Sequence, residues 1–466
     1  MQISNVNIKD LNPEFRIDAE YYRAEVLNRL GILQRHKKAN LDDLVDFVIG
    51  PFGSTVTADK YVSDSDYRYI RNKDIDDFLI KDDAPALISK EVYENLPHFH
   101  IKEDDLLITV VGTLGKVAIA TKKDAKSIFS CKSTILRAKR INPFFLLAYL
   151  NCKTGQLFCL RGKRGAIQEG LNLSDLKEIQ VYIPKDDEFQ TTIENIIRIS
   201  FGKTENSNHL YSQADELLLS ELGLLDWRPK HILSFVRNYS ETGQAGRIDA
   251  EYFQPKYEQI VKAIKSYKGG WDTLGNLVNI KDRNYTPKDK QSYKYIELAN
   301  IAGNGEITDC MIEEGQNLPS RARRKVGAGD VIVSSIEGSL SSIALIEKEY
   351  DQSLCSTGFY VVNSKILNSP TLLVLLKSMI GQLQLKKGCS GTILTAINSE
   401  ELKKVILPVI DQDTQARIRQ KIDESFALRR QSKHLLACAK QAVEMAIEKD
   451  ETTALQWLKE RAKDNG

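Results

Sequence analysis

The sequence RIDAEYY at residues 16–22 recurs as RIDAEYF at residues 247–253, with six of its seven residues unchanged. Three longer matches follow in the same order: YRYIRNKDI from Tyr67 with YKYIELANI from Tyr293, DLLITVVGTLGKVAIA from Asp105 with DVIVSSIEGSLSSIALI from Asp330, and TGQLFCLRGKRGAIQEGLNLSDLKEI from Thr154 with IGQLQLKKGCSGTILTAINSEELKKV from Ile380. Repeats that keep their order over most of a chain indicate an internal duplication. We therefore expect two halves with one common fold.

The segments that fail to match are as informative as those that match. Residues 31–60, 76–100 and 271–290 show little correspondence, whereas the matched pieces are apolar strand-like runs, turn glycines and helix signals. One scaffold with two different surfaces is typical of a protein that recognises two different things with one kind of module. Duplication without functional divergence is the other interpretation.

Composition limits the classes of protein that the chain can belong to. Its 466 residues are 42% hydrophobic and 27% charged, enough for two or more domains with sizeable cores. The net charge is only +2, so any nucleic-acid surface must be a local patch. The seven cysteines include no C-x-x-C pair, which argues against a zinc site and a disulfide framework. No apolar run is long enough for a membrane span, and the N-terminal MQISNVNIKDLNPEF has no basic start followed by an apolar run, so we expect a cytoplasmic protein.

Each half reads as mixed α and β, so the expected fold class is α+β. The β-branched runs DLLITVVG and DVIVSSIEG are broken by glycine, which predicts strand, turn and strand. Asn142-Pro143 before FFLLAYL and Ser369-Pro370 before LLVLLKSMI each predict a cap and a first-turn proline ahead of an apolar helix. Tyr67, Tyr69, Tyr293 and Tyr295 alternate along strand-like runs and are expected in the core or on a sheet face rather than stacked on bases.

Two proline-free segments follow the modules and predict long amphipathic helices. The expected organisation is a first module at 1–185, a central helix region at 186–225, a second module at 226–410 and a C-terminal helix at 411–466. Packing the two helices against each other as an antiparallel pair would bury both apolar stripes. Alternatively, each helix packs on its own module. Gly202 and the polar run KTENSN after it are expected to interrupt the first helix.

Sequence motifs of known catalytic and cofactor sites are incomplete in this chain. Asn142-Pro143-Phe144-Phe145 lacks the second proline of the amino-methyltransferase motif, and a helix cap explains it better. Gly112-Thr-Leu-Gly115-Lys116 lacks the first glycine and the final Ser or Thr of a phosphate-binding loop. His98 and His100 are the only close histidine pair, and we expect them to be ordinary exposed polar residues. No catalytic residue, cofactor site or metal site is therefore predicted in this chain.

Clustered cations are the candidate DNA contacts. Arg161, Lys163 and Arg164 in the first half and Lys386 and Lys387 in the second occupy matching glycine turns, where the backbone could approach a phosphate. A solvated charged turn is the alternative for both. A further cluster, present only in the second half, is a candidate for reading bases because arginine pairs bidentately with guanine: Arg321, Arg323 and Arg324.

The order of these parts resembles the specificity subunit of Type I restriction-modification enzymes. The resemblance rests on the RIDAEYY and RIDAEYF openings, a recognition domain, a G-x-x-G segment, an apolar strand and a long helix, repeated over essentially the whole chain. At the junction from domain to helix the family usually has a proline-rich stretch followed by Glu-Gln. This sequence keeps Gln190 and Gln415 there, without the Glu-Gln pair.

The resemblance implies that each recognition domain reads one half of a split double-stranded DNA target. It implies further that the paired helices fix the spacer between the two halves and dock the modification subunits. It also implies two modification subunits, which methylate adenine N6 with S-adenosylmethionine, and restriction subunits that use ATP and magnesium. Neither chemistry is expected in this chain. The charges repeated in the two motifs are expected to form scaffold ion pairs or a docking surface for the modification subunits rather than to read bases: Arg16, Asp18 and Glu20, and Arg247, Asp249 and Glu251. A protein-only adaptor built from duplicated modules remains the rival interpretation.

Overall fold

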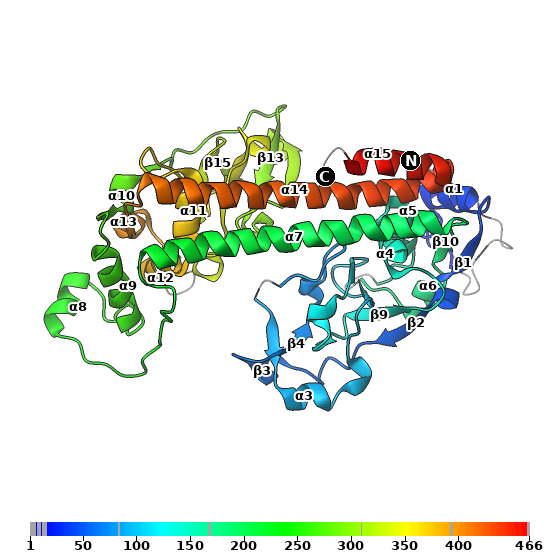
Figure 1. Cartoon of the computed structure of the whole chain (residues 1–466), viewed down its shortest axis with the longest axis horizontal. Helices are drawn as coiled ribbons and strands as arrows, with labels where there is room; N and C mark the ends of the chain where they lie inside the picture. The colour runs from blue at the N-terminus through cyan, green and yellow to red at the C-terminus, as the bar shows by residue number, and fades with distance from the viewer. Residues whose placement is uncertain are drawn as a thin grey trace. The chain divides into compact units, whose positions relative to one another are not determined.

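The computed structural model describes residues 6, 11, 16–82, 84–165, 169–308, 310–391 and 395–463. The chain forms two compact units, and each is described by itself. The first unit comprises residues 1–203 and 430–466, and the second comprises residues 204–429 (Figure 1). Each unit therefore contains one half of each long helix.

Two four-stranded sheets form the first unit. The first has the order β2 (Val45–Ile49), β9 (Ser133–Ala138), β6 (Leu106–Thr109) and β7 (Val117–Ile119), with antiparallel pairs throughout. The second has the order β3 (Tyr61–Val62), β5 (Ala86–Ile88), β4 (Tyr67–Ile70) and β8 (Ser127–Phe129), with β4 and β8 parallel. A separate antiparallel pair joins β1 (Lys38–Asn40) to β10 (Gln180–Tyr182).

The second unit repeats these pairings. One sheet has the order β12 (Asn279–Ile280), β19 (Phe359–Asn363), β16 (Val331–Ser334) and β17 (Ile343–Leu345). The other has the order β14 (Met311–Glu314), β13 (Ser292–Ile296), β18 (Leu354–Ser356) and β15 (Ala322–Lys325), with β13 and β18 again parallel. Two short pairs join β11 (Trp271–Thr273) to β22 (Ile406–Pro408) and β20 (Cys389–Ser390) to β21 (Ala396–Ile397). The predicted common fold is confirmed, with one exchange at the sheet edges. Among the described strands, β15 has no counterpart in the first unit and β3 has none in the second.

The central strands β6 and β16 are buried on both faces. In β6, Leu106 and Ile108 belong to one hydrophobic core and Leu107 to another, because successive side chains of a strand point to opposite faces. The alternate residues of β16 divide between two cores in the same way. A central strand buried on both faces explains the nearly continuous apolar runs in the two matched segments.

A buried aspartate precedes each central strand. Asp105 accepts two hydrogen bonds of 2.7 Å from the guanidinium of Arg137 and one from the backbone N–H three residues earlier. Asp330 likewise accepts from the backbone N–H three residues earlier, and its charge partner is Lys281 at 2.8 Å. Both carboxylates are almost fully buried. They are therefore scaffold ion pairs at equivalent positions with different cations.

Most of the shorter helices occupy corresponding places along the chain in the two units. The first unit has α1 (Ala24–Leu33), α2 (Leu41–Leu44), α3 (Lys90–Glu94), α4 (Pro143–Asn151), α5 (Lys153–Arg161) and α6 (Leu173–Lys177). The second unit has α8 (Tyr239–Ala245), α9 (Pro255–Lys265), α10 (Leu274–Leu277), α11 (Ser369–Lys377), α12 (Met379–Gly388) and α13 (Ser399–Lys404). Asn142 caps α4 as predicted, by accepting from two backbone N–H groups. In α11 the cap is Asn368 rather than the predicted Ser369, which is the first helical residue.

The long helices differ from prediction in two respects. α7 (Asp187–Glu221) is unbroken, so the predicted interruption at Gly202 is wrong. The polar run after Gly202 is held across to the neighbouring helix, by Lys203 to Gln431 and by Ser207 to Ser425. The C-terminal region is two helices rather than one, α14 (Gln412–Glu448) and α15 (Glu451–Lys463). Asp450 separates them by accepting the backbone N–H of Thr453 as the cap of α15.

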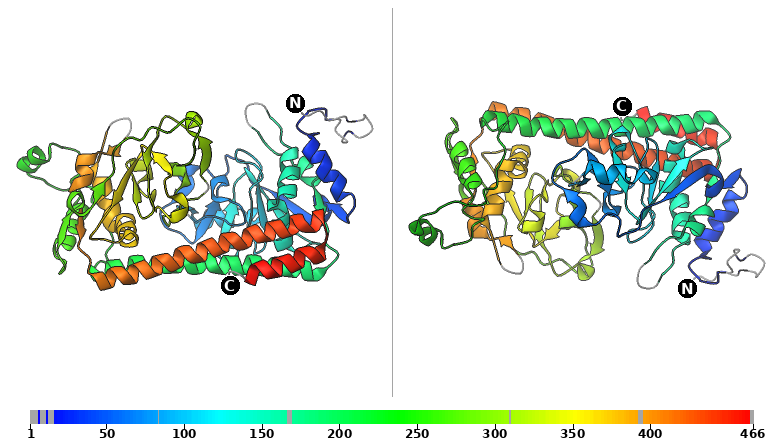
Figure 2. Two further views of the ribbon diagram at one scale, coloured as in Figure 1. Left: turned by 90° about the horizontal axis from the view of Figure 1, so that it is seen from above. Right: turned by 90° about the horizontal axis from the view of Figure 1, so that it is seen from below.

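Both predicted ways of burying the long helices are found within the units. In the first unit, the hydroxyl groups of Ser200 on α7 and Ser432 on α14 lie 2.7 Å apart. In the second unit, those of Ser207 and Ser425 lie 3.0 Å apart, and Lys421 of α14 donates to Gln213 of α7. Rising numbers on α7 meet falling numbers on α14, so the pairing is antiparallel. Figure 2 shows α15 beside the start of α7, where Lys459 pairs with Glu188.

The junction glutamines join each long helix to its own unit. The side-chain oxygen of Gln190 accepts from the backbone N–H of Asn142, which caps α4. Gln415 accepts the same bond from Asn368, the cap of α11, at 2.8 Å. Gln415 also donates to the carbonyl oxygens of Ile366 and Ile410. The glutamine retained at both junctions thus positions the start of the long helix on the apolar helix of the same unit.

Candidate nucleic-acid interface

The first basic turn follows α5 and is held by the repeated motif. The guanidinium of Arg16 donates to the carbonyl oxygens of Gly162 at 3.3 Å and Lys163 at 3.2 Å. It also contacts Asp18 at 2.8 Å and Asp175 at 3.2 Å. A single arginine therefore fixes the backbone of a turn that lies far from it in sequence. We call this set of contacts the motif clasp.

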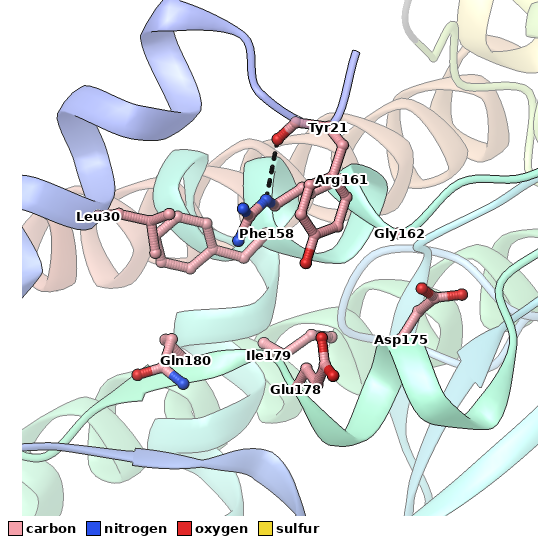
Figure 3. A pocket seen from close by; sticks show the side chains of 9 residues that line it. All are labelled: Tyr21, Leu30, Phe158, Arg161, Gly162, Asp175, Glu178, Ile179 and Gln180. Atoms are coloured by element: carbon pink, nitrogen blue, oxygen red, sulfur yellow. Dashed lines mark hydrogen bonds between the residues drawn. The ribbon is translucent and has the colours of Figure 1, made fainter. Parts of the chain in front are cut away.

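A tyrosine of the motif completes the clasp between two cations. The guanidinium carbons of Arg16 and Arg161 lie 4.4 and 3.7 Å from the ring centroid of Tyr21. Arg161 also donates its Nε hydrogen to the carbonyl oxygen of Tyr21 at 2.9 Å, as Figure 3 shows. A small pocket of about 20 Å³, with room for about one water molecule, lies beside this stack. Burial lowers the pKa of Arg161 and raises that of Tyr21.

The second unit builds the same clasp from equivalent residues. The guanidinium of Arg247 donates to the carbonyl oxygens of Lys387 at 3.3 Å and Cys389 at 2.9 Å, and its pair with Asp249 is 2.7 Å long. The ring of Tyr252 lies between Arg247 and Lys387, at 4.5 and 4.7 Å from its centroid. Burial lowers the pKa of Lys387. Lys387 thus takes the place that Arg161 has in the first unit.

These contacts divide the predicted phosphate-binding cations into two groups. Arg161 and Lys387 stack inside the clasps, and Arg164 forms a two-pronged pair with Asp175 at 2.8 and 2.9 Å. Lys163 pairs with Glu169 at 2.5 Å, and the Lys386 ammonium lies 3.8 Å from Glu251 with its side chain 45% exposed. Arg161 and Lys387 therefore make internal contacts within the clasps. Lys163 and Arg164 have side chains 33% and 34% exposed, each paired with a carboxylate, and Lys386 is exposed.

The arginine cluster of the second unit lies on and beside β15. Arg321 is exposed, and Arg323 donates from Nε to the carbonyl oxygen of Ser320 at 3.1 Å. A register shift between Ala322 and Arg324 in the pairing with β18 places Arg324 opposite Cys355, on the face of the inner core. The three arginines predicted as one cluster therefore point into different surroundings.

Arg324 has an unusual environment among these cations. Its Nε and Nη1 atoms are buried, and neither has a hydrogen-bond partner. Within the described ranges, it alone has two side-chain nitrogens in this state. Burying a guanidinium nitrogen without a hydrogen-bond acceptor costs free energy. A ligand that supplied an anionic or other acceptor atom would offset that cost.

Sequence reasoning located the turns and missed the tyrosines that organise them. Tyr21 and Tyr252 occupy the same position of the repeated motif, and this repetition could have indicated that the tyrosine matters. Its stacking partners could not be predicted, because they lie far away in the sequence. Tyr69, Tyr293 and Tyr295 are buried, which confirms their predicted place in the sheets.

The described residues contain no group of three or more His, Cys, Asp or Glu side chains arranged to hold a metal ion. Among the helices of the described part of the chain, none is both long and apolar enough to cross a membrane.

Comparison with known proteins finds a matching family model and a similar specificity subunit. Residues 35–214 match the model of the Type I restriction modification DNA specificity domain. The chain is 28% identical over 120 residues to the Type I restriction enzyme EcoBI specificity subunit of Escherichia coli, a match that covers 26% of this chain and 25% of that protein. The matched region thus spans a quarter of the relative's length.

Solved S subunits also align with most of the chain. The Type I S subunit from M. genitalium is 14% identical, with 88% of this chain and 95% of that chain covered and a TM-score of 0.41. The HsdS subunit from Thermoanaerobacter tengcongensis is 15% identical, with 89% and 97% covered and a TM-score of 0.28. Residues 35–214, most of which lie in the first unit, thus match a Type I restriction modification DNA specificity domain, and the second unit repeats the main strand pairings of the first.

Proposed function

We propose that this chain reads DNA sequence for a Type I restriction-modification complex, each unit recognising one half of a split double-stranded target. The observation that carries the proposal is one fold built twice, the first copy matching a DNA specificity domain and the two copies differing in their surface segments. Sequence is read from base edges and positioned by phosphate contacts, so such a reader needs variable polar surfaces and no reactive centre.

The chain itself is non-catalytic in this proposal. Two modification subunits supply adenine-N6 methylation with S-adenosylmethionine, and restriction subunits supply the chemistry that uses ATP and magnesium. The paired helices α7 and α14 act as the spacer between the two recognition events. Their tie to each unit through Gln190 and Gln415 supports this part, because a spacer must be fixed at its ends.

Among the candidate contacts, we assign phosphate binding to Lys163 and Lys386. Lys163 lies in the turn after α5 and Lys386 in the last turn of α12, next to backbone that the motif clasp holds in place. Each ammonium group lies near a carboxylate, Glu169 at 2.5 Å and Glu251 at 3.8 Å. Arg161, Arg164 and Lys387 support these turns from within, and act on DNA binding by holding the turn.

Base reading in the second unit is assigned to β15, with Arg324 as its principal residue and Arg321 and Arg323 beside it. Two buried nitrogens of Arg324 lack an acceptor, and in this proposal the side chain turns out of the core so that guanine O6 and N7 supply one. The described residues of the first unit pair no strand with the free edge of β8, so the two units present different edges to DNA.

The test is to express the chain together with an active modification subunit and to map methylated adenines across the host genome by single-molecule sequencing. We expect a split two-part motif that disappears when the specificity chain is omitted. Methylation that does not depend on this chain, with a partner shown to be active, would contradict the proposal and favour a protein-only adaptor.

A further inference from the structure

An isoleucine of the repeated motif is exposed in both units. Ile17 is 85% exposed and Ile248 is 89% exposed, and each directly follows the arginine of its motif clasp. Single exposed apolar residues are common on protein surfaces. The same exposed isoleucine at the same place in two otherwise diverged copies is a different observation, because neither side chain contributes to the core of its unit.

The backbone on both sides of each isoleucine is held in place. In the first unit, Asp18 binds the side chain of Arg16 and accepts the backbone N–H of Tyr21 at 3.0 Å. In the second unit, Asp249 accepts the backbone N–H of Tyr252 at 3.1 Å in the same way. The clasp therefore presents the isoleucine in one defined position, and little conformational entropy remains to be lost when a partner covers it.

The charges around the isoleucines favour a protein over DNA. Asp18 and Glu20 have side chains 45% and 64% exposed beside Ile17. Asp249 and Glu251 are 46% and 38% exposed beside Ile248. These carboxylates are paired with cations of the chain, Asp18 with Arg16 and Asp249 with Arg247, so each isoleucine lies in a mixed apolar and charged surface of the kind that protein partners cover.

We propose that Ile17 and Ile248 are the anchors of two equivalent docking sites, each for one copy of the modification subunit. The duplication identifies the partner. The same anchor on both units fits two copies of one protein, whereas the DNA-reading surfaces differ between the units. Each copy would receive the isoleucine in an apolar pocket lined by lysine or arginine. The inference rests on the proposed function, and names the surface by which that partner is held.

The test uses the full chain, expressed with the modification subunit. Ile17→Asp, Ile248→Asp and the double variant are purified, and the stoichiometry of each complex is measured by native mass spectrometry. We expect two copies of the modification subunit on the parent chain, one on each single variant and none on the double variant. Ile17→Val and Ile248→Val should retain two copies.

Matched controls place the same change elsewhere on the surface. Ile49 on β2 is 53% exposed and Ile312 on β14 is 63% exposed, and both lie outside the motif. Ile49→Asp and Ile312→Asp should leave two copies bound. If an aspartate variant folds poorly, a photocrosslinking residue at position 17 or 248 gives a second measurement, which should join the chain to the modification subunit.

The outcomes separate this inference from the proposed function. A double variant that still binds two copies, or crosslinks from positions 17 and 248 to DNA alone, would overturn the docking sites and leave DNA reading intact. A parent chain that binds no active modification subunit would instead contradict the proposed function itself.

Discussion

The two units form the same two contacts, on the motif tyrosine and on the buried aspartate, with different cations. Arg161 stacks on the motif tyrosine in the first unit, and Lys387 takes that place in the second. The buried aspartate before the central strand pairs with Arg137 in one unit and with Lys281 in the other. The acceptors and rings are retained while the cations vary, which shows that the geometry of these contacts requires a positive charge rather than a particular side chain. The surfaces that we assign to DNA have no such equivalent positions, since the arginines on and beside β15 occur only in the second unit.

The largest expected effect tests the equivalence of the buried aspartates. Asp105→Ala and Asp330→Ala should each lower the free energy of unfolding by about 3 kcal/mol, because each leaves a cation and a backbone N–H without their buried acceptor. Chemical denaturation monitored by circular dichroism measures this. Asp46→Ala removes an exposed partner of Lys139 and should cost less than about 1 kcal/mol. A small loss at only one buried aspartate would break the comparison.

Arg324 should separate the units by function. Arg324→Gln should weaken binding of target DNA by about 1–3 kcal/mol and relax the sequence preference of one half-site only. Arg324→Lys keeps the charge but loses the planar fork, and should rescue little of the loss. Arg419→Gln, a change at an exposed helix position, is the control. Binding curves for targets altered in either half measure the effect, and equal loss in both halves would contradict the assignment.

Equivalent positions of the two long helices carry different residues, Asp215 on α7 and Lys440 on α14. Burial raises the pKa of Asp215 to about 6, so the folded chain retains a proton that the unfolded chain releases above about pH 4. Stability should therefore fall as the pH rises from about 4 through 6. Asp215→Asn should stabilise the chain by about 1–2 kcal/mol at pH 7.5 and by little at pH 4. Equal effects at both pH values in denaturation experiments would contradict this origin.

The smallest effect concerns the turn lysines. Lys163→Ala and Lys386→Ala should each weaken binding to all DNA sequences alike and reduce the slope of log affinity against log salt by about 1. Arg161→Ala should also weaken binding, but with a loss of thermal stability, because it removes the stack on Tyr21. Salt titrations compared with melting curves distinguish a direct contact from support of the turn. An unchanged slope in both lysine variants would overturn the phosphate assignment.

The sequence predicted the elements better than their ends and their partners. Order-preserving matches predicted the repeated fold, and apolar periodicity predicted both long helices. The sequence did not predict that α7 continues through Gly202. The polar run there is held by hydrogen bonds from Lys203 and Ser207 to residues of α14, which lie far away in the sequence. The break at Asp450 depends on a local cap that sequence reasoning overlooked. Arg161 and Arg164 were recognised as cations, but their acceptors Tyr21 and Asp175 could be identified only from the folded chain.

The central claim is that the two units read DNA separately. The most direct test replaces residues 31–185 with the matching domain of another specificity subunit, expresses the chimera with the modification subunit and maps methylated adenines genome-wide. The account predicts a motif in which one half is new and the other half is that of the parent chain. A motif changed in both halves would contradict it.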